Sequence, residues 1–93
     1  MASKVRFTAR ALASLDAADA YLRPRNPTAA NNLRDEIERL TGLIADFPEM
    51  SPAIRGSKMR YHVTRRYRYR IVYRVIGHTI EIRDILHPSR SGP

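Results

Sequence analysis

Three things are scarce in this chain: cysteine, long apolar runs and, in its second half, acidic residues. The absence of cysteine excludes disulfides and cysteine-based zinc sites, and it fits a reducing compartment such as the cytosol. No apolar run approaches the roughly 20 residues of a membrane span. The opening stretch MASKVRF has no apolar region of the kind found in signal peptides. We therefore expect one cytoplasmic domain, over residues 1–93, with no membrane partner.

The charge is distributed unevenly along the chain. Residues 1–54 hold seven basic and seven acidic groups, whereas residues 55–93 hold ten basic groups against only Glu81 and Asp84, so the formal charge of +8 lies in the second part. Fifteen of the 17 basic residues are arginine, whose planar fork matches phosphate and carboxylate groups. An anionic partner, either nucleic acid or an acidic protein, is indicated. The alternative is that the charge only keeps the protein soluble.

The sequence offers little support for metal or cofactor chemistry. His62, His78 and His87 lack the spacing of metal ligands, and the four glycines form no phosphate-binding loop. Glu81 and Asp84 stand three apart on an expected strand, which places them on opposite faces rather than as a catalytic pair. We expect neither a metal nor a cofactor.

The first half predicts a short strand and two helices. Residues 4–8 alternate as in a strand, Thr8 is positioned to cap a helix, and Pro24 ends that helix. Asn26 or Thr28 can cap a second helix, with Pro27 in its first turn and Pro48 after its end. The apolar stripes are Leu12, Leu15, Ala18 and Leu22 on the first helix, and Ala30, Leu33, Ile37, Leu40, Ile44 and Phe47 on the second. A link of about four residues makes the helices an antiparallel hairpin.

The second half predicts an antiparallel meander. After a loop over residues 48–57 the period becomes alternating, with strands near 59–64, 67–75 and 79–86 and a tight hairpin at Gly77. The expected fold class is α+β: an N-terminal strand, a two-helix hairpin and a three-stranded meander. The helices cover the apolar face of the sheet, and the first strand adds to an edge.

Alternation in the stretch RRYRYRIVYRV divides its side chains between two faces. We expect one face to point toward the helices, with Tyr67, Tyr69, Ile71, Tyr73 and Val75. The other face carries Arg66, Arg68, Arg70, Val72 and Arg74. Burying unpaired arginines costs several kcal/mol each, so this second face is open to solvent or to a partner. Arg60 and His62 are expected beside it on one neighbouring strand, and Arg83, with His87 as an open alternative, on the other.

Nearly the whole chain resembles the ParE/RelE superfamily of bacterial type II toxins. VRFTARALASLDAADAYL is similar to the family's opening strand and first helix, and NPTAANNLRDEIERLTGLIADFPEM to its second helix. MRYHVTRRYRYRIVYRVIGHTIEIRDILHPSR is similar to its sheet. The resemblance implies a RelE/ParE-like fold and a cognate antitoxin, ParD-like or other, that binds the toxin in a hetero-oligomer. It also implies a chromosomal or plasmid-stabilising toxin–antitoxin pair.

The superfamily contains two activities. RelE-type members cut mRNA on the ribosome, and ParE-type members inhibit DNA gyrase. Arg70, in YRIVYRV, resembles the position of a catalytic arginine of the RelE type. However, no tyrosine follows Tyr73, whereas the RelE type usually has a tyrosine or histidine near the chain end; ILHPSR is more similar to the ParE ending.

The resemblance therefore favours the ParE type, a gyrase inhibitor without catalytic residues of its own, with His87 and Arg90 as the best candidates for target contact. The wider set of expected target or antitoxin contacts is Arg60, Arg68, Arg70, Arg74, Arg83, His87 and Arg90. The main alternative is a metal-independent, RelE-type mRNA endonuclease that uses Arg60, His62, Arg70 and His87. A second alternative is a non-toxic basic module in direct contact with nucleic acid.

Overall fold

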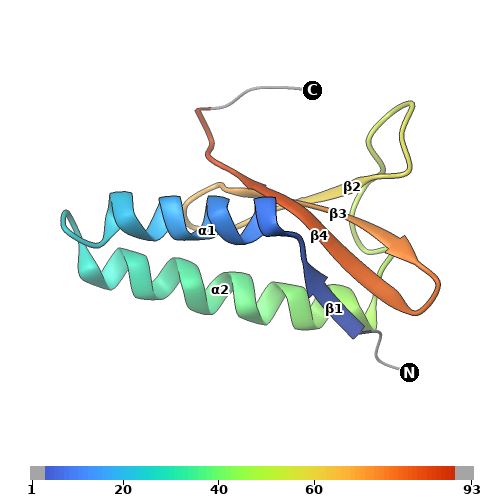
Figure 1. Cartoon of the computed structure of the whole chain (residues 1–93), viewed down its shortest axis with the longest axis horizontal. Coiled ribbons are helices and arrows are strands. Elements are labelled where there is room, and N and C mark those ends of the chain that lie inside the picture. Colours follow the sequence, from blue (N-terminus) through green and yellow to red (C-terminus); the bar gives the residue numbers. More distant parts are fainter. Residues whose placement is uncertain (1–3, 90–93) are drawn as a thin grey trace.

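The computed structural model describes residues 4–89 and contains two helices and a four-stranded sheet (Figure 1). The elements, in chain order, are β1 (Lys4–Phe7), α1 (Ala9–Leu22), α2 (Pro27–Asp46), β2 (Arg60–Val63), β3 (Arg70–Ile76) and β4 (Thr79–Leu86). The order strand, helix, helix and three strands confirms the predicted α+β class.

Side-chain caps fix where both helices begin. The Thr8 hydroxyl accepts a hydrogen bond from the amide of Ala11 at 3.1 Å, and the Asn26 side-chain oxygen accepts one from the amide of Ala29 at 3.0 Å. The second cap is thus Asn26 rather than Thr28, with Pro27 in the first turn. Each cap satisfies an amide that has no partner within the helix, which is worth about 1 kcal/mol.

The sheet has the strand order β1-β4-β3-β2. β2, β3 and β4 form the predicted antiparallel meander, and β1 adds to the free edge of β4 as a parallel strand. The hairpin between β3 and β4 turns at Gly77, whose φ of 58° suits glycine. The helices lie side by side against one face of the sheet, and no helix of residues 4–89 covers its other face (Figure 1).

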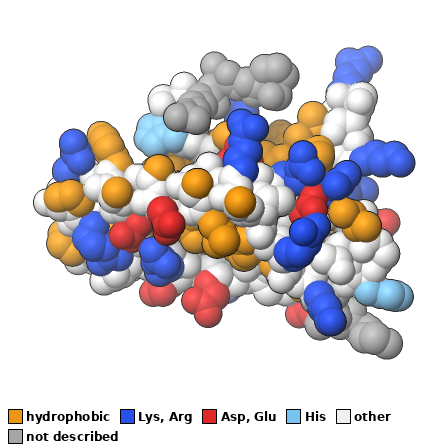
Figure 2. Space-filling view, in the orientation of Figure 1, with side chains coloured by type: hydrophobic (Ala, Val, Ile, Leu, Met, Phe, Trp, Pro, Cys, Tyr) orange, Lys and Arg blue, Asp and Glu red, His pale blue; other side chains and the backbone are white. Residues whose placement is uncertain are grey.

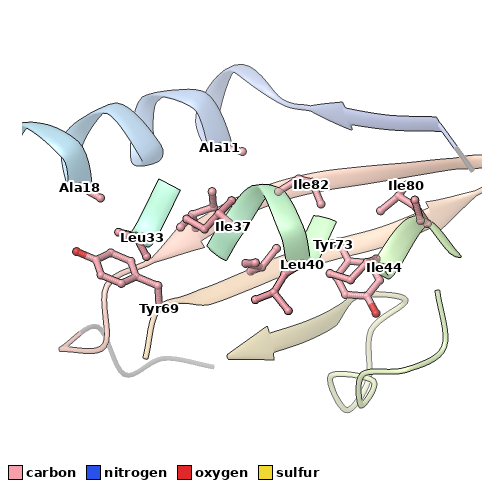
Figure 3. Packing of buried hydrophobic residues seen from close by; sticks show 13 residues of the cluster. Ala11, Ala18, Leu33, Ile37, Leu40, Ile44, Tyr69, Tyr73, Ile80 and Ile82 are labelled. Atoms are coloured by element: carbon pink, nitrogen blue, oxygen red, sulfur yellow. The ribbon is translucent and has the colours of Figure 1, made fainter. Parts of the chain in front are cut away.

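The core lies between α2 and the central strands (Figure 3). Leu33, Ile37 and Ile44 of α2 are at most 2% exposed, and they belong to one cluster with the fully buried Ile71 and Tyr73 of β3. Ile80, Ile82 and Ile85 supply the β4 side of the same cluster. The core therefore uses the predicted stripe of α2 almost in full.

Three predicted core residues lie at the surface instead. Leu12 is 49% exposed, and Ala11 takes the buried place on that turn of α1. Phe47, at the end of α2, is 60% exposed, and Val75, near the end of β3, is 43% exposed. Phe47 is the C-terminal cap residue of α2, with φ of −132°, so the helical periodicity that predicted its burial no longer applies there.

The prediction that one strand covers residues 67–75 is wrong for its first three residues, since β3 begins at Arg70. Residues 64–69 form the link between β2 and β3, closed by a hydrogen bond of 2.7 Å from the Thr64 amide to the Tyr69 carbonyl. Arg68 adopts a left-handed conformation with φ of 62°, which breaks the strand pattern. Arg66 and Arg68 therefore do not belong to the face of β3, although Tyr69 is buried as expected.

The faces of β2 are also opposite to the prediction. Arg60 pairs with Tyr73 and His62 pairs with Ile71, and directly paired residues point to the same side of a sheet. Arg60 and His62 consequently lie on the helix side. Tyr61, which pairs with Val72, points to the uncovered side instead.

A β-bulge interrupts the alternation of β4. Val72 pairs with Asp84 while Tyr73 pairs with Ile82, so Arg83 is an extra residue without a partner on β3. Glu81 and Asp84 are both paired with outward residues of β3, but their side chains bind on opposite sides: Glu81 binds arginines of the uncovered side, and Asp84 binds Arg10 and Ser14 of α1. They still do not form a pair, because their side chains bind different partners.

Candidate functional site

The uncovered side of the sheet carries a dense group of arginines. β1 contributes Arg6, β3 contributes Arg70 and Arg74, and β4 contributes Arg83 at its bulge. We call the surface formed by these four residues and Glu81 the arginine face. In Figure 2, basic side chains gather over the strand half of the molecule around acidic ones.

Glu81 is the centre of the arginine face. Its Oε1 accepts hydrogen bonds from Arg74 Nε at 2.8 Å and from Arg83 Nη1 at 3.2 Å, while its Oε2 is paired with Arg6. The residue is 4% exposed, whereas the side chains of Arg6, Arg74 and Arg83 are 60%, 36% and 44% exposed. The hydrogen bond from Arg74, aided by Arg83 and Arg6, lowers the pKa of Glu81 below its ordinary value. Glu81 is therefore a carboxylate at neutral pH.

Arg70 extends the arginine face toward β2. Its guanidinium lies 5.9 Å from the centre of the Tyr61 ring, in the range of a cation–π contact. Tyr61 itself is half-buried. Of the predicted arginines of the open face, Arg70, Arg74 and Arg83 thus lie on the same side of the sheet, and Arg6 of β1 lies there too.

Arg60 and His62 contact the loop before β2. Arg60 Nη1 donates to the carbonyl of Ser51 at 2.7 Å, and His62 Nδ1 is hydrogen-bonded to the hydroxyl of Ser51 at 3.0 Å. Ser51 is 2% exposed. These two side chains hold the loop against the sheet on the side opposite the arginine face.

Arg68 lies near α2 rather than on the sheet. It lines a hollow of about 340 Å³ together with His62, Arg39 and Leu43. Arg66 lines another hollow beside α2, and the neighbouring Arg65 amide donates to the Glu36 carboxylate. Neither residue joins Arg70.

His87 directly follows the C-terminal end of β4 and lies against α1. Its ring makes edge contacts with Tyr69 at 5.3 Å and with Tyr21 at 6.3 Å between centroids. The three rings line a cavity of about 430 Å³. Burial, with a smaller contribution from Tyr21, raises the pKa of Tyr69, so its hydroxyl stays protonated at neutral pH. Arg90 lies outside the described residues.

A second surface, which we call the apolar groove, lies where α2 ends. Phe47, Met50 and Val75 line this hollow of about 750 Å³ and are 60%, 38% and 43% exposed. The hollow is also lined by two basic residues, Lys58 and Arg60, two acidic residues, Asp46 and Glu49, and Pro48. The hydroxyl of the buried Tyr73 donates to the Pro48 carbonyl at 2.9 Å and fixes the loop that forms the groove.

The described part of the chain contains no group of three or more potential ligands that could hold a metal ion. Neither of its helices is both long and apolar enough to cross a bilayer.

Sequence reasoning missed two residues of these surfaces. Arg6 alternates with Val5 and Phe7, which indicates that its side chain points away from the helices. Only the parallel pairing of Arg6 with Glu81 shows that it belongs to the arginine face. Phe47 was assigned to the core because it continues the helical spacing of α2. The proline that follows it was the available signal that the helix, and with it the spacing, ends there.

Comparison with known proteins agrees with this architecture. The family model described as ParE toxin of the type II toxin–antitoxin system parDE matches residues 5–92. A chain of the chromosomal ParDE toxin–antitoxin system from P. aeruginosa superposes with a TM-score of 0.79 at 19% identity, over 91% of this chain and 95% of that one. A chain of the RelBE2 toxin–antitoxin complex from Mycobacterium tuberculosis gives a TM-score of 0.64 at 22% identity, over 94% and 99%. No curated protein sequence matches the chain.

Proposed function

We propose that this chain inhibits DNA gyrase by protein–protein contact. The proposal starts from its family, since the chain belongs to the ParE toxins of type II toxin–antitoxin systems. In the same proposal a cognate antitoxin binds the chain and neutralises it. The toxin acts in the bacterial cytoplasm, where gyrase works, and it has no catalytic step of its own.

The observation that carries this choice is the scatter of the residues that a nuclease would need. A metal-free ribonuclease requires a proton carrier and phosphate-binding cations around one phosphodiester. Arg70 lies on the arginine face, whereas Arg60 and His62 lie on the opposite side of the sheet and are engaged by Ser51. His87 packs between Tyr21 and Tyr69. The four residues of the endonuclease alternative are therefore not assembled around one point.

The apolar groove supports the antitoxin part of the proposal. The exposed apolar side chains of the groove fit the apolar side of an amphipathic antitoxin segment, and Lys58 and Arg60 beside Asp46 and Glu49 offer charges of both signs to its polar side. Acidic groups of the antitoxin would also speed its association with a chain of charge +8. Both solved relatives above are components of toxin–antitoxin assemblies.

The test uses purified toxin, separated from its antitoxin, in two parallel assays. One measures gyrase supercoiling and trapped cleavage complexes, and the other measures mRNA cleavage on translating ribosomes. We expect gyrase inhibition with intact mRNA. Cleaved mRNA with unaffected gyrase would reverse the proposal in favour of the RelE type.

Variants sharpen the comparison. Arg70→Ala abolishes mRNA cleavage if the endonuclease alternative holds, whereas the matched Arg66→Ala, in the link before β3, does not. Under our proposal His87→Ala and Arg90→Ala weaken gyrase inhibition, since the C-terminal residues are the proposed target contacts. If both retain full inhibition, the contact surface lies elsewhere.

A further inference from the structure

The arginine face holds more positive charge than its own carboxylate can neutralise. Arg6, Arg74 and Arg83 share the single carboxylate of Glu81, so three positive charges meet one negative charge and a surplus of two remains. Arg70 adds a further positive charge on the same side. The only other acidic residue of the strands, Asp84, is occupied by Arg10 and Ser14 of α1.

Donors also remain on these arginines. Each guanidinium has five N–H donors in a fixed fork, and each gives one hydrogen bond to Glu81. Their side chains are 36–60% exposed, so the remaining donors are accessible from the uncovered side. Glu81 thereby holds arginines from three strands in place while their free edges face outward. Such a preorganised array loses little side-chain entropy when an anion binds.

We propose that the arginine face binds the phosphate backbone of duplex DNA, without reading base sequence. Arg70 and Arg74 stand four residues apart on β3, or roughly 13 Å, which is comparable to about four steps of duplex rise. Guanidinium forks form paired hydrogen bonds with phosphate oxygens.

An acidic protein is the weaker candidate for this surface. The centres of protein–protein interfaces are depleted in charged residues, whereas protein–DNA interfaces are polar and strongly basic. The centre of the arginine face is a cluster of ions. The apolar side chains suited to a protein partner, Phe47 and Met50, lie in the apolar groove at the end of α2.

The arrangement of aromatic rings favours duplex over single-stranded nucleic acid. Single-stranded binding depends on bases stacking on exposed aromatic side chains. Tyr69 and Tyr73 are buried, and Tyr61, the half-buried tyrosine of this side, is within cation–π distance of Arg70. The arginine face therefore offers contacts to phosphates rather than rings on which bases could stack.

The test measures fluorescence polarisation of a labelled duplex of about 20 base pairs as the purified chain is added, over roughly 50–200 mM salt. The double variant Arg74→Ala/Arg83→Ala leaves Arg6 to pair with Glu81. A plot of log affinity against log salt has a negative slope, and each lost phosphate contact makes it less steep by about 0.9. For the double variant we therefore expect a slope less steep by about 1.8 and binding weakened about tenfold or more. Arg74→Lys/Arg83→Lys, which keeps both charges, should keep most of the salt slope.

The matched control is Arg25→Ala/Arg39→Ala, which removes the same charge from exposed positions on the helix side. It should change the slope by much less than the double variant of the arginine face. Urea unfolding of every variant shows whether the fold is retained. If the alanine double variant does not fold, the salt slope of the lysine double variant is used for the test instead.

Four outcomes would overturn this inference: no duplex binding by the unmodified chain at low salt, equal effects of the control and the test variants, tighter binding of single-stranded RNA than of duplex DNA, or loss of the salt slope in the Lys pair. The inference does not rest on gyrase inhibition. Gyrase is absent from the binding assay, so failure of one proposal leaves the other measurable.

Discussion

The replacement Phe47→Ala tests whether the apolar groove receives the antitoxin. Phe47 is 60% exposed in the free chain and lines the groove beside Met50 and Val75. A phenylalanine contributes about 200 Å² of surface, so about 120 Å² remains for a partner to bury. At about 25 cal/mol per Å² this area corresponds to about 3 kcal/mol.

That value is an upper bound for the loss of affinity, because part of it is offset when the partner segment is ordered on binding. At about 1.4 kcal/mol for each factor of ten, we expect toxin–antitoxin affinity to fall between about 10-fold and 100-fold. Isothermal titration calorimetry on the purified pair measures it. The free energy of unfolding of the toxin should change little, because the side chain is mostly exposed.

The matched control is Leu12→Ala, which removes a 49% exposed apolar side chain from α1, away from the groove. It should leave the affinity within about twofold of the original. The reasoning is refuted if Phe47→Ala binds the antitoxin normally, or if Leu12→Ala weakens binding just as much.

Three further predictions concern stability. Ile37→Ala empties a site that is 2% exposed in the core and should lower the free energy of unfolding by about 2–5 kcal/mol in urea titrations; a loss below about 1 kcal/mol would contradict the packing described here. Tyr73→Phe leaves the Pro48 carbonyl without its hydrogen bond and should cost about 1 kcal/mol, seen as a lower thermal midpoint with an unchanged core. Because the pKa of Glu81 is lowered in the folded chain, its stabilisation is present above the ordinary value of 4.5 and is lost as the pH falls through the lowered one. Glu81→Gln should therefore flatten the decline of stability on acidification, and an unchanged decline would exclude Glu81 as its source.

Much of the fold could be predicted because local signals and burial agree. Thr8 and Asn26 cap the helices that their positions predicted, and the spacing from Leu33 to Ile44 selected the buried side of α2. The switch from helical to alternating period located the meander. These features depend on short-range chemistry, which is visible in a single sequence.

The candidate site was predicted less well because its geometry depends on long-range pairing. In β2, alternation predicts that Arg60 and His62 lie beside the open face of the sheet. At this edge of the sheet, however, the helix side meets the loop of Ser51, which satisfies Arg60 and His62 with a carbonyl and a hydroxyl. An edge strand has no deep core on either side, so its alternation alone does not decide which face is which.

The link before β3 and the bulge in β4 are further examples. Arg68 in a left-handed conformation has no signal in its residue type, since glycine or asparagine is expected there. The bulge at Arg83 inserts one residue into the alternation, and only the register between β3 and β4 reveals it.

The side of the sheet on which Arg60 and His62 of β2 lie decides the chemistry of this chain more than its composition does. If Arg60 and His62 projected beside Arg70, as first predicted, an imidazole and two guanidiniums would share one surface, which is the minimum for metal-free phosphodiester cleavage. Because the register turns them to the helix side, the uncovered side keeps its arginines, while among the described residues of its strands no imidazole joins them. A surface of that kind can bind phosphate without cleaving it. The same register places Arg60 in the lining of the apolar groove, so one chain separates a surface suited to a protein from a surface suited to DNA.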